Sequence, residues 1–368
     1  MSQSNHPRPM FHFDLNARDL LAERRGQFLG WGIARRTLAE AESRVTDTWN
    51  EGPGGWVFEW CRIARRLEDR GATLQASLAF GAAKFPALGS DSRCDAYENQ
   101  LRTFRSTSLA ERHALSLPYR GDNIEVVTHR YRARRARAAL CLTGGVDTWK
   151  VELHRLASTM SRLGRLDVTV FDMPGTGEST VPLAADADEI YAGVLNHIRS
   201  DIQPTGIMGI SFGGLWAVKL ALGGSVDFAI DLGGPVGSEN RSLDELAALS
   251  NGMSGIIAHS LWLDHLPTQT ELDGLFRDFS LRREISTTAE LSVPLLVVNG
   301  LNDPYLPVSD TDVFRRFDRA TVWGVKGAGH CAAERIRPVI AGTLGWISNQ
   351  VRPRRLNRMA VATASALL

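Results

Sequence analysis

The sequence predicts an α/β fold, in which a mostly parallel central sheet is flanked by helices. From about Asp122 onward, short β-rich runs alternate with helical stretches, and strands separated by helices favour a parallel sheet covered on both faces. From Leu15 to about Leu117, apolar residues instead recur at spacings of three and four, which is typical of helices. The chain therefore combines a helical N-terminal region with an α/β core.

The N-terminal region, residues 1–118, is predicted to form a helical lid domain. Trp56 and Trp60 lie on one apolar helical face, and helix breaks rich in glycine and proline fall at residues 52–55 and 86–89. The tryptophans are large rings suited to covering an apolar ligand. No Pro- or Ser-rich linker follows, so we expect this region to pack broadly on the core. The alternative is a dimerisation domain that leaves the pocket open.

The core, residues 119–350, is expected to hold the strands of the sheet and the helices between them. The predicted strands are residues 124–128, 138–142, 166–171, 206–210, 228–232, 295–299 and 321–325. The predicted helices are residues 151–163, 187–199, 214–222, 309–317 and 338–349. Residues 235–292 interrupt this rhythm and are interpreted as a helical insertion after the sixth strand of the fold, above the carboxyl edge of the sheet. The tail, residues 351–368, is expected to be loosely held.

Composition excludes several classes of partner. The net charge of +1 gives no field that would steer the chain to nucleic acid or to an anionic membrane. The N-terminus lacks the apolar core of a signal peptide, and the uncharged run near residue 210 is too short to span a bilayer. The four cysteines form no C-x-x-C pair and indicate reduced thiols. We therefore expect a cytoplasmic protein with no nucleic-acid or membrane partner, and a homodimer is compatible with the sequence.

No cofactor or metal site is predicted. The glycine-rich loop at residues 172–179 matches neither nucleotide-binding spacing and is interpreted as structural, shaping the floor of the site. His259, Trp262, Asp264 and His265 are expected to be partly exposed helix residues. A metal site is the alternative for this group, but the residues lack the H-E-x-x-H order of a zinc site.

The most informative segment is Gly209-Ile210-Ser211-Phe212-Gly213, which has the pattern G-x-S-x-G. An apolar run precedes it and a helix-forming stretch follows it, which is the strand–turn–helix context of a nucleophile elbow. Glycines are expected on both sides of the serine because a Cβ there would clash with the crossing strand and helix. The pattern therefore predicts Ser211 as a catalytic nucleophile.

A serine hydroxyl needs a base, and the base needs an orienting acid. Asp303 follows the predicted strand 295–299, and His330 follows the next strand, so both lie on loops at the sheet edge that carries Ser211. The order Ser, Asp, His along the chain fits an elbow-bearing α/β enzyme. We predict that His330 takes the Ser211 proton and that Asp303 orients His330. The rival acid is Asp231, at the end of the preceding strand.

Acyl transfer also requires donors for the developing oxyanion. The backbone N–H of Phe212, directly after the nucleophile, is predicted as the first donor. The second is expected from the glycine-containing loop after the strand 138–142, where Gly145 and Val146 remain alternatives.

These motifs resemble the α/β-hydrolase superfamily. Gly144-Gly145-Val146-Asp147, Asp172-Met173-Pro174-Gly175 and His330-Cys331 are similar to a lid-bearing subgroup that includes dihydroxypseudooxynicotine hydrolase, fungal polyketide-shortening hydrolases and FrsA-like proteins. The stretch 79–86 resembles the helical N-terminal domain of that subgroup. The resemblance implies an α/β-hydrolase fold with a helical N-terminal lid domain.

The resemblance also implies a function. Members of this subgroup cleave esters or carbon–carbon bonds next to a ketone, and related polyketide enzymes eliminate acetate from a tetronate ring. Carbon–carbon cleavage can enlist an extra acid in the lid, for which Glu239, Asp244 and Glu245 all lie in the right segment. We expect a serine hydrolase acting on a bulky small molecule of polyketide-type secondary metabolism. The alternatives are an acetate eliminase and a non-catalytic binding protein on a hydrolase scaffold.

Overall fold

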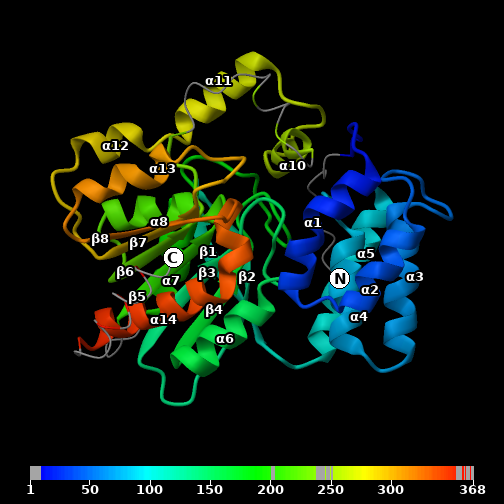
Figure 1. Ribbon diagram of the computed structural model, residues 1–368, viewed down its shortest axis with the longest axis horizontal. Coiled ribbons are helices and arrows are strands. Elements are labelled where there is room, and N and C mark those ends of the chain that lie inside the picture. The colour runs from blue at the N-terminus through cyan, green and yellow to red at the C-terminus, as the bar shows by residue number, and fades with distance from the viewer. Residues whose placement is uncertain are drawn as a thin grey trace.

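The protein is described here from a computed structural model, which describes residues 10–199, 204–237 and 252–353 and the single residues 245, 249, 359, 361 and 365. Within these residues, an eight-stranded sheet has the order β1-β2-β4-β3-β5-β6-β7-β8 (Figure 1). The strands are β1 Glu111–Tyr119, β2 Asp122–Tyr131, β3 Ala138–Thr143, β4 Leu166–Phe171, β5 Thr205–Ile210, β6 Phe228–Leu232, β7 Leu295–Gly300 and β8 Ala320–Val325. β2 is antiparallel to both β1 and β4, and the other neighbours are parallel.

Helices cover both faces of this sheet. Helices α6 (His154–Gly164) and α14 (Ile336–Val351) pack together on one face, and α7 (Asp188–Ile198) and α8 (Gly213–Leu222) pack together on the other. Successive strand residues point to opposite faces, and alternate β3 residues accordingly join two different apolar clusters. The predicted α/β fold is confirmed. The predicted helix at 309–317 is a short α-helix, α13 (Ser309–Asp312), continued by a 3-10 turn, η1 (Val313–Arg316).

One element was predicted wrongly. Residues up to about Leu117 were predicted to form helices, but Glu111–Tyr119 forms the edge strand β1. Its buried residues Leu115, Leu117 and Tyr119 alternate with exposed ones, which is the period of a strand with one buried face. Pro118 is tolerated because an edge strand does not need every N–H.

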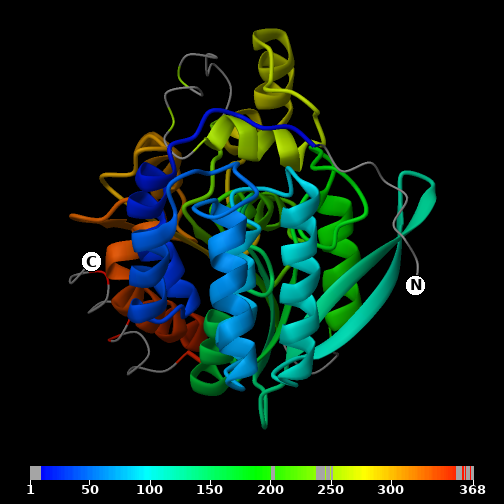
Figure 2. The same cartoon turned by 90° about the vertical axis from the view of Figure 1, so that its right-hand side faces the viewer.

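The N-terminal helices lie beside the sheet and pack on one another (Figures 1 and 2). They are α1 Ala17–Trp31, α2 Arg35–Arg44, α3 Trp56–Asp69, α4 Thr73–Ala83 and α5 Asp91–Ser106. Phe28, Trp56, Trp60 and Phe85 are fully buried at their centre and meet at ring separations of 5.7–6.4 Å. Trp56 and Trp60 therefore stabilise the helical region itself.

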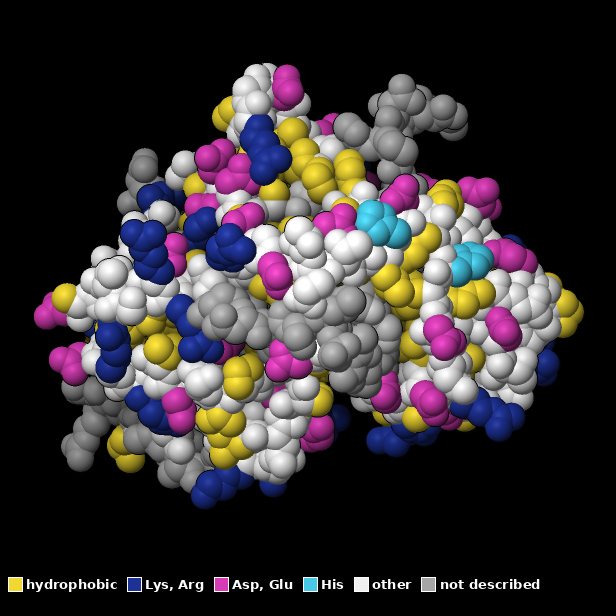
Figure 3. Space-filling view, turned by 90° about the horizontal axis from the view of Figure 1, so that it is seen from above, with side chains coloured by type: hydrophobic (Ala, Val, Ile, Leu, Met, Phe, Trp, Pro, Cys, Tyr) yellow, Lys and Arg dark blue, Asp and Glu magenta, His cyan; other side chains and the backbone are white. Residues whose placement is uncertain are grey.

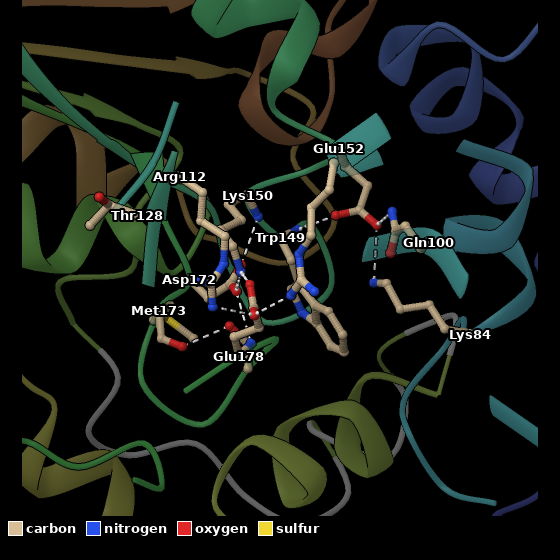
Figure 4. A network of polar contacts seen from close by, with 12 residues as sticks. Lys84, Gln100, Arg112, Thr128, Trp149, Lys150, Glu152, Asp172, Met173 and Glu178 are labelled. Atoms are coloured by element: carbon tan, nitrogen blue, oxygen red, sulfur yellow. Dashed lines mark hydrogen bonds and ion pairs between the residues drawn. The ribbon is translucent and has the colours of Figure 1, made fainter. Parts of the chain in front are cut away.

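A buried polar network joins these helices to the core (Figure 4). Lys84, which follows α4, lies 3.3 Å from a Glu152 oxygen, and its ammonium sits over the Trp149 ring. Gln100 of α5 donates to the same Glu152 oxygen at 2.8 Å. Lys84 and Glu152 are both nearly inaccessible to solvent. The contact is therefore a buried ion pair across the junction.

A second buried lysine explains the glycine-rich loop at residues 172–179. The Lys150 ammonium pairs with Asp172 and, at 2.7 Å, with Glu178 (Figure 4). Glu178 also pairs with Arg105 of α5 at 3.1 Å. Burial alone would raise the pKa of Glu178, but Lys150 and the arginines lower it to about 2. The loop therefore holds charges at the junction, in keeping with its interpretation as structural.

Lys84→Met is expected to lower the free energy of unfolding by about 3–5 kcal/mol, because it leaves the Glu152 carboxylate buried without a counter-ion. Urea unfolding would measure this. Adding Glu152→Gln to Lys84→Met should recover part of the loss, since the uncompensated charge is then removed. A destabilisation below about 1 kcal/mol would show that the pair does not stabilise the junction.

The insertion lies above the carboxyl ends of the strands and contains α10 (Met253–Ser260), α11 (Gln269–Asp278) and α12 (Arg282–Thr287) (Figure 1). The N-terminal segment crosses α10, where Phe11 stacks on His259 at 4.3 Å. His259 is 7% exposed, so its expected exposure was wrong; this contact between distant segments is not visible in the helical pattern. From above, this face shows hydrophobic side chains among charges of both signs (Figure 3). None of the described helices is long and apolar enough to cross a membrane.

Candidate active site

Ser211 lies in the sharp turn between β5 and α8, with a backbone φ of +53°. This left-handed conformation is rare for a residue with a side chain and stores local strain. The flanking glycines are required sterically. A Cβ on Gly209 would lie 2.0 Å from the Gly213 carbonyl oxygen, and one on Gly213 would lie 2.4 Å from the Gly144 oxygen. The segment therefore has the predicted elbow geometry.

The structure brings Ser211, His330 and Asp303 into one hydrogen-bonded chain. His330 Nε2 is 2.9 Å from Ser211 Oγ, and His330 Nδ1 is 2.7 Å from Asp303 Oδ2. Asp303 follows β7, and His330 begins η2 (His330–Arg335), a 3-10 segment after β8. Three loops at the carboxyl edge of the sheet thus converge.

The pKa shifts of Asp303 and His330 are those expected of a basic imidazole oriented by an ionised carboxylate. Burial alone would raise the pKa of Asp303, but hydrogen bonds from His330, Asn299 and the Tyr305 N–H lower it. Burial alone would lower the pKa of His330, but the hydrogen bond to the Asp303 carboxylate and the negative charge of that group raise it above its ordinary value. Asp303 is therefore the ionised partner of the imidazole.

Asp231, the rival acid, is bonded to a backbone N–H, whereas His330 is bonded to Asp303. Its carboxylate accepts from the Gly234 N–H at 2.7 Å on the fully buried strand β6. Burial raises the pKa of Asp231 to about 8, so this carboxyl group is largely protonated at neutral pH. A neutral acid stabilises an imidazolium poorly, which favours Asp303 in that role.

Asn299, which was not predicted from the sequence, links the loop that carries Asp303 to the loop that carries His330. Its Nδ2 donates to Asp303 Oδ2 at 2.7 Å, and its Oδ1 accepts from the Cys331 N–H at 3.0 Å. The side chain therefore fixes the acid and the residue after His330 relative to each other. A polar residue ending an apolar strand, four positions before Asp303, was the available signal.

Asn299→Ala is expected to lower the free energy of unfolding by about 1–3 kcal/mol, because the buried Cys331 N–H loses its acceptor. Turnover should fall as well, since Asp303 and His330 lose a shared support. Urea unfolding and steady-state kinetics would measure both effects. Asn299→Asp, which keeps the acceptor for Cys331 but places a second carboxylate beside Asp303, should raise the pH needed for activity. Wild-type stability in Asn299→Ala would contradict the bridging role.

The predicted oxyanion loop approaches Ser211 closely. A Cβ on Gly145 would lie 2.9 Å from Ser211 Cβ and 3.1 Å from the Phe212 nitrogen. Only glycine fits here without displacing the serine. Val146, the other candidate, is buried and lines the adjacent cavity. The choice between their N–H groups as the second donor stays a prediction, as does the donor role of Phe212.

Two cavities meet at Ser211. One, of about 90 Å³, is apolar and lies beneath the insertion. Its walls include Met253 and Ile257 of α10, Leu261 directly after that helix, and Leu272, Leu275 and Phe276 of α11. Tyr305, whose ring meets the His330 ring edge-on at 5.0 Å, lines both cavities and was not predicted from the sequence.

The second cavity, of about 730 Å³, is more polar and is walled on one side by α1. Glu23, Arg24 and Gln27 of α1 face it together with Asn302 and Glu334. The N-terminal region was expected to cover the site with aromatic rings, but the residues that α1 contributes to this wall are polar. The amphipathic periodicity of the sequence predicts a helix here, but it does not show which polar residues of α1 face the core.

Of the three candidate lid acids, the structure describes only Glu245. Glu239 and Asp244 lie outside the described residues, and Glu245 is exposed and lines neither cavity. All four cysteines are free thiols. Across the described part of the chain, no group of three or more His, Cys, Asp or Glu side chains is arranged to hold a metal ion.

Comparisons with known proteins agree with this architecture. Residues 139–340 match the model of the alpha/beta hydrolase family. Esterase FrsA of Photobacterium profundum is 22% identical over 324 residues, covering 78% of this chain and 75% of that protein. The structure of AbyA5 wild type has a TM-score of 0.77 at 20% identity, covering 94% of this chain and 99% of AbyA5. The structure of the 2,6-dihydroxy-pseudo-oxynicotine hydrolase has a TM-score of 0.66 at 20% identity, covering 89% of this chain and 95% of that protein. The predicted resemblance to FrsA-like proteins and to this hydrolase is confirmed.

Proposed function

This chain belongs to the alpha/beta hydrolase family, and on that premise we propose that it is a serine hydrolase acting on a bulky, largely apolar small molecule. The observation that carries the proposal is the hydrogen-bonded chain from Ser211 through His330 to Asp303, beside an apolar cavity lined by α10 and α11. A nucleophile, a base and an orienting acid in sequence are the parts that acyl transfer requires.

In the proposed mechanism, His330 Nε2 takes the Ser211 proton as Oγ attacks the substrate carbonyl. The Phe212 N–H and an N–H of the Gly145–Val146 segment stabilise the resulting oxyanion. His330 then returns the proton to the leaving group, an alkoxide for an ester or an enolate for a carbon–carbon bond. Water, activated by His330, hydrolyses the acyl-enzyme and restores the Ser211 hydroxyl.

The walls of the site support the substrate class. The apolar cavity suits the hydrocarbon part of a substrate, and helices α10 and α11 along its walls favour a small molecule over a polymer. The name of the FrsA relative supports an ester as the bond. The motif resemblance to polyketide-processing hydrolases supports a substrate from polyketide-type secondary metabolism.

A fluorophosphonate probe tests the nucleophile, with mass mapping of the labelled residue. Labelling confined to Ser211 is the expected result, and an unlabelled wild-type protein would support a non-catalytic binding protein instead. Turnover in ¹⁸O-water tests the reaction class. Hydrolysis places the heavy oxygen in the released acid, whereas elimination leaves the products unlabelled and creates a double bond.

The acid limb of kcat/KM is expected to lie above pH 6.5, the ordinary histidine value. Only the neutral imidazole accepts the Ser211 proton, so activity falls as pH drops through the pKa of His330, which is raised. Initial rates measured across pH at low substrate concentration give this limb. A midpoint clearly below pH 6.5 would contradict the raised pKa.

A further inference from the structure

The loop between β3 and α6 carries the candidate oxyanion donors and is held by the N-terminal helices. Arg24 of α1 pairs with Asp147 at 2.8 Å, and both side chains are about nine-tenths buried, with 9% and 10% exposed. Gln27, one turn further along α1, donates through Nε2 to Thr148 Oγ1 at 2.7 Å and to Asp147 Oδ1 at 3.2 Å. These contacts lie two and three residues beyond Gly145.

The shape of the loop depends on the residues that α1 holds. A Cβ on Gly144 would lie 1.9 Å from the Thr148 carbonyl oxygen, so the chain closes here into a tight turn. Because this turn is tight, a displacement of Asp147 or Thr148 must move the Gly145 backbone. Gly145 in turn lies against Ser211 and the Phe212 nitrogen. The path from α1 to the nucleophile is therefore short and packed.

The far side of the loop is held as well. Trp149 Nε1 donates to the Val146 carbonyl at 3.1 Å, and its ring packs edge-on against Tyr97 of α5 at 5.0 Å. Lys84 lies over the same ring (Figure 4). Helices α1 and α5, with the residue following α4, thus contact the loop on both sides of the turn.

We propose that Arg24 and Gln27 are positioning residues that fix the Gly145–Val146 backbone beside Ser211, so that α1 completes the oxyanion site. The inference rests on the proposed function and deepens it. Breaking the pair leaves a nearly buried charge without its partner. In the absence of Arg24, relief requires Asp147 to move toward water, which displaces the N–H that would face the oxyanion.

Asp147→Asn and Gln27→Leu test this role in the full chain. The probes are p-nitrophenyl butyrate for turnover and butylboronic acid, whose serine adduct places an oxygen in the oxyanion site. We expect kcat to fall ~10–100-fold, somewhat less than the loss of a whole oxyanion donor, with KM changed by less than about threefold. Affinity for the boronic acid should fall in parallel with kcat, which a loss of stability alone does not produce.

Two controls separate positioning from docking of α1. Arg155 of α6 donates to the Leu29 carbonyl at 3.3 Å and so also joins α1 to the core, but away from the loop. Arg25, next to Arg24, pairs with Glu42 of α2 at the surface. Arg155→Met and Arg25→Ala are therefore expected to retain wild-type kcat and boronic-acid affinity.

Arg24→Ala provides a second variant. Millimolar guanidinium added to this variant should restore kcat if Asp147 needs only its counter-ion, and should leave Gln27→Leu unaffected. Wild-type kcat in both Asp147→Asn and Gln27→Leu overturns the positioning role while leaving that of Ser211 intact. Failure of the wild-type protein to react with a fluorophosphonate would instead overturn the proposed function on which the inference rests.

Discussion

Ser211→Ala is expected to reduce kcat by about 10⁶-fold, because the acyl-enzyme can no longer form. Residual turnover of roughly 10³–10⁴ over the uncatalysed rate should persist from oxyanion stabilisation and substrate binding. The fold should remain intact, since alanine keeps the Cβ that serine already places at a strained φ of +53° and adds no volume. Steady-state kinetics and thermal unfolding measure the two effects.

Ser116→Ala serves as the control, since Ser116 is exposed on β1 and far from the site in the sheet order. It should retain wild-type turnover and fluorophosphonate labelling. Near-wild-type turnover by Ser211→Ala would remove the nucleophile assignment. It would indicate that His330 acts as a general base directly on water or on a substrate proton.

The fold was predictable because its signals are local. Apolar strands such as β3 and β7, separated by amphipathic helices, determine a parallel sheet without reference to distant residues. The edge strand β1 was missed because half of its residues are exposed and it directly follows a helical region. Its alternating Leu115, Leu117 and Tyr119 carried the correct period over only five residues.

The site residues were predictable only where the backbone conformation requires a recognisable sequence motif. The elbow around Ser211 requires glycines, and loops after parallel strands converge at one edge, which led to Asp303 and His330. Asn299 and Tyr305 were missed because their roles depend on which loops face each other. Arg24 was missed for the same reason, since its partner Asp147 lies more than a hundred residues away on another element. Such pairings are set by tertiary packing and have no local period.

The second large effect is expected for Asp303→Asn, which should lower kcat by about 10⁴-fold. Asp303 Oδ1 accepts from the N–H groups of Tyr305 and Leu306, so an amide oxygen at that position keeps two hydrogen bonds, and the variant loses only the bond from Asn299 Nδ2 to Oδ2. The amide NH₂ then faces His330 Nδ1 and donates to it. This donation forces the imidazole proton onto Nε2, the atom that faces Ser211. A protonated Nε2 cannot accept the proton of the Ser211 hydroxyl.

Asp231→Asn is the matched comparison for this substitution. Asp231 is buried and, with its pKa raised to about 8, largely neutral at pH 7, so an amide replaces it with little change in charge. Its oxygen can still accept from the Gly234 N–H, and kcat should fall less than about tenfold. Both variants should be compared at the same pH, with folding checked by thermal unfolding. A crippled Asp231→Asn beside a mildly affected Asp303→Asn would transfer the orienting role to Asp231, and His330 would then have to turn away from Asp303 during the reaction.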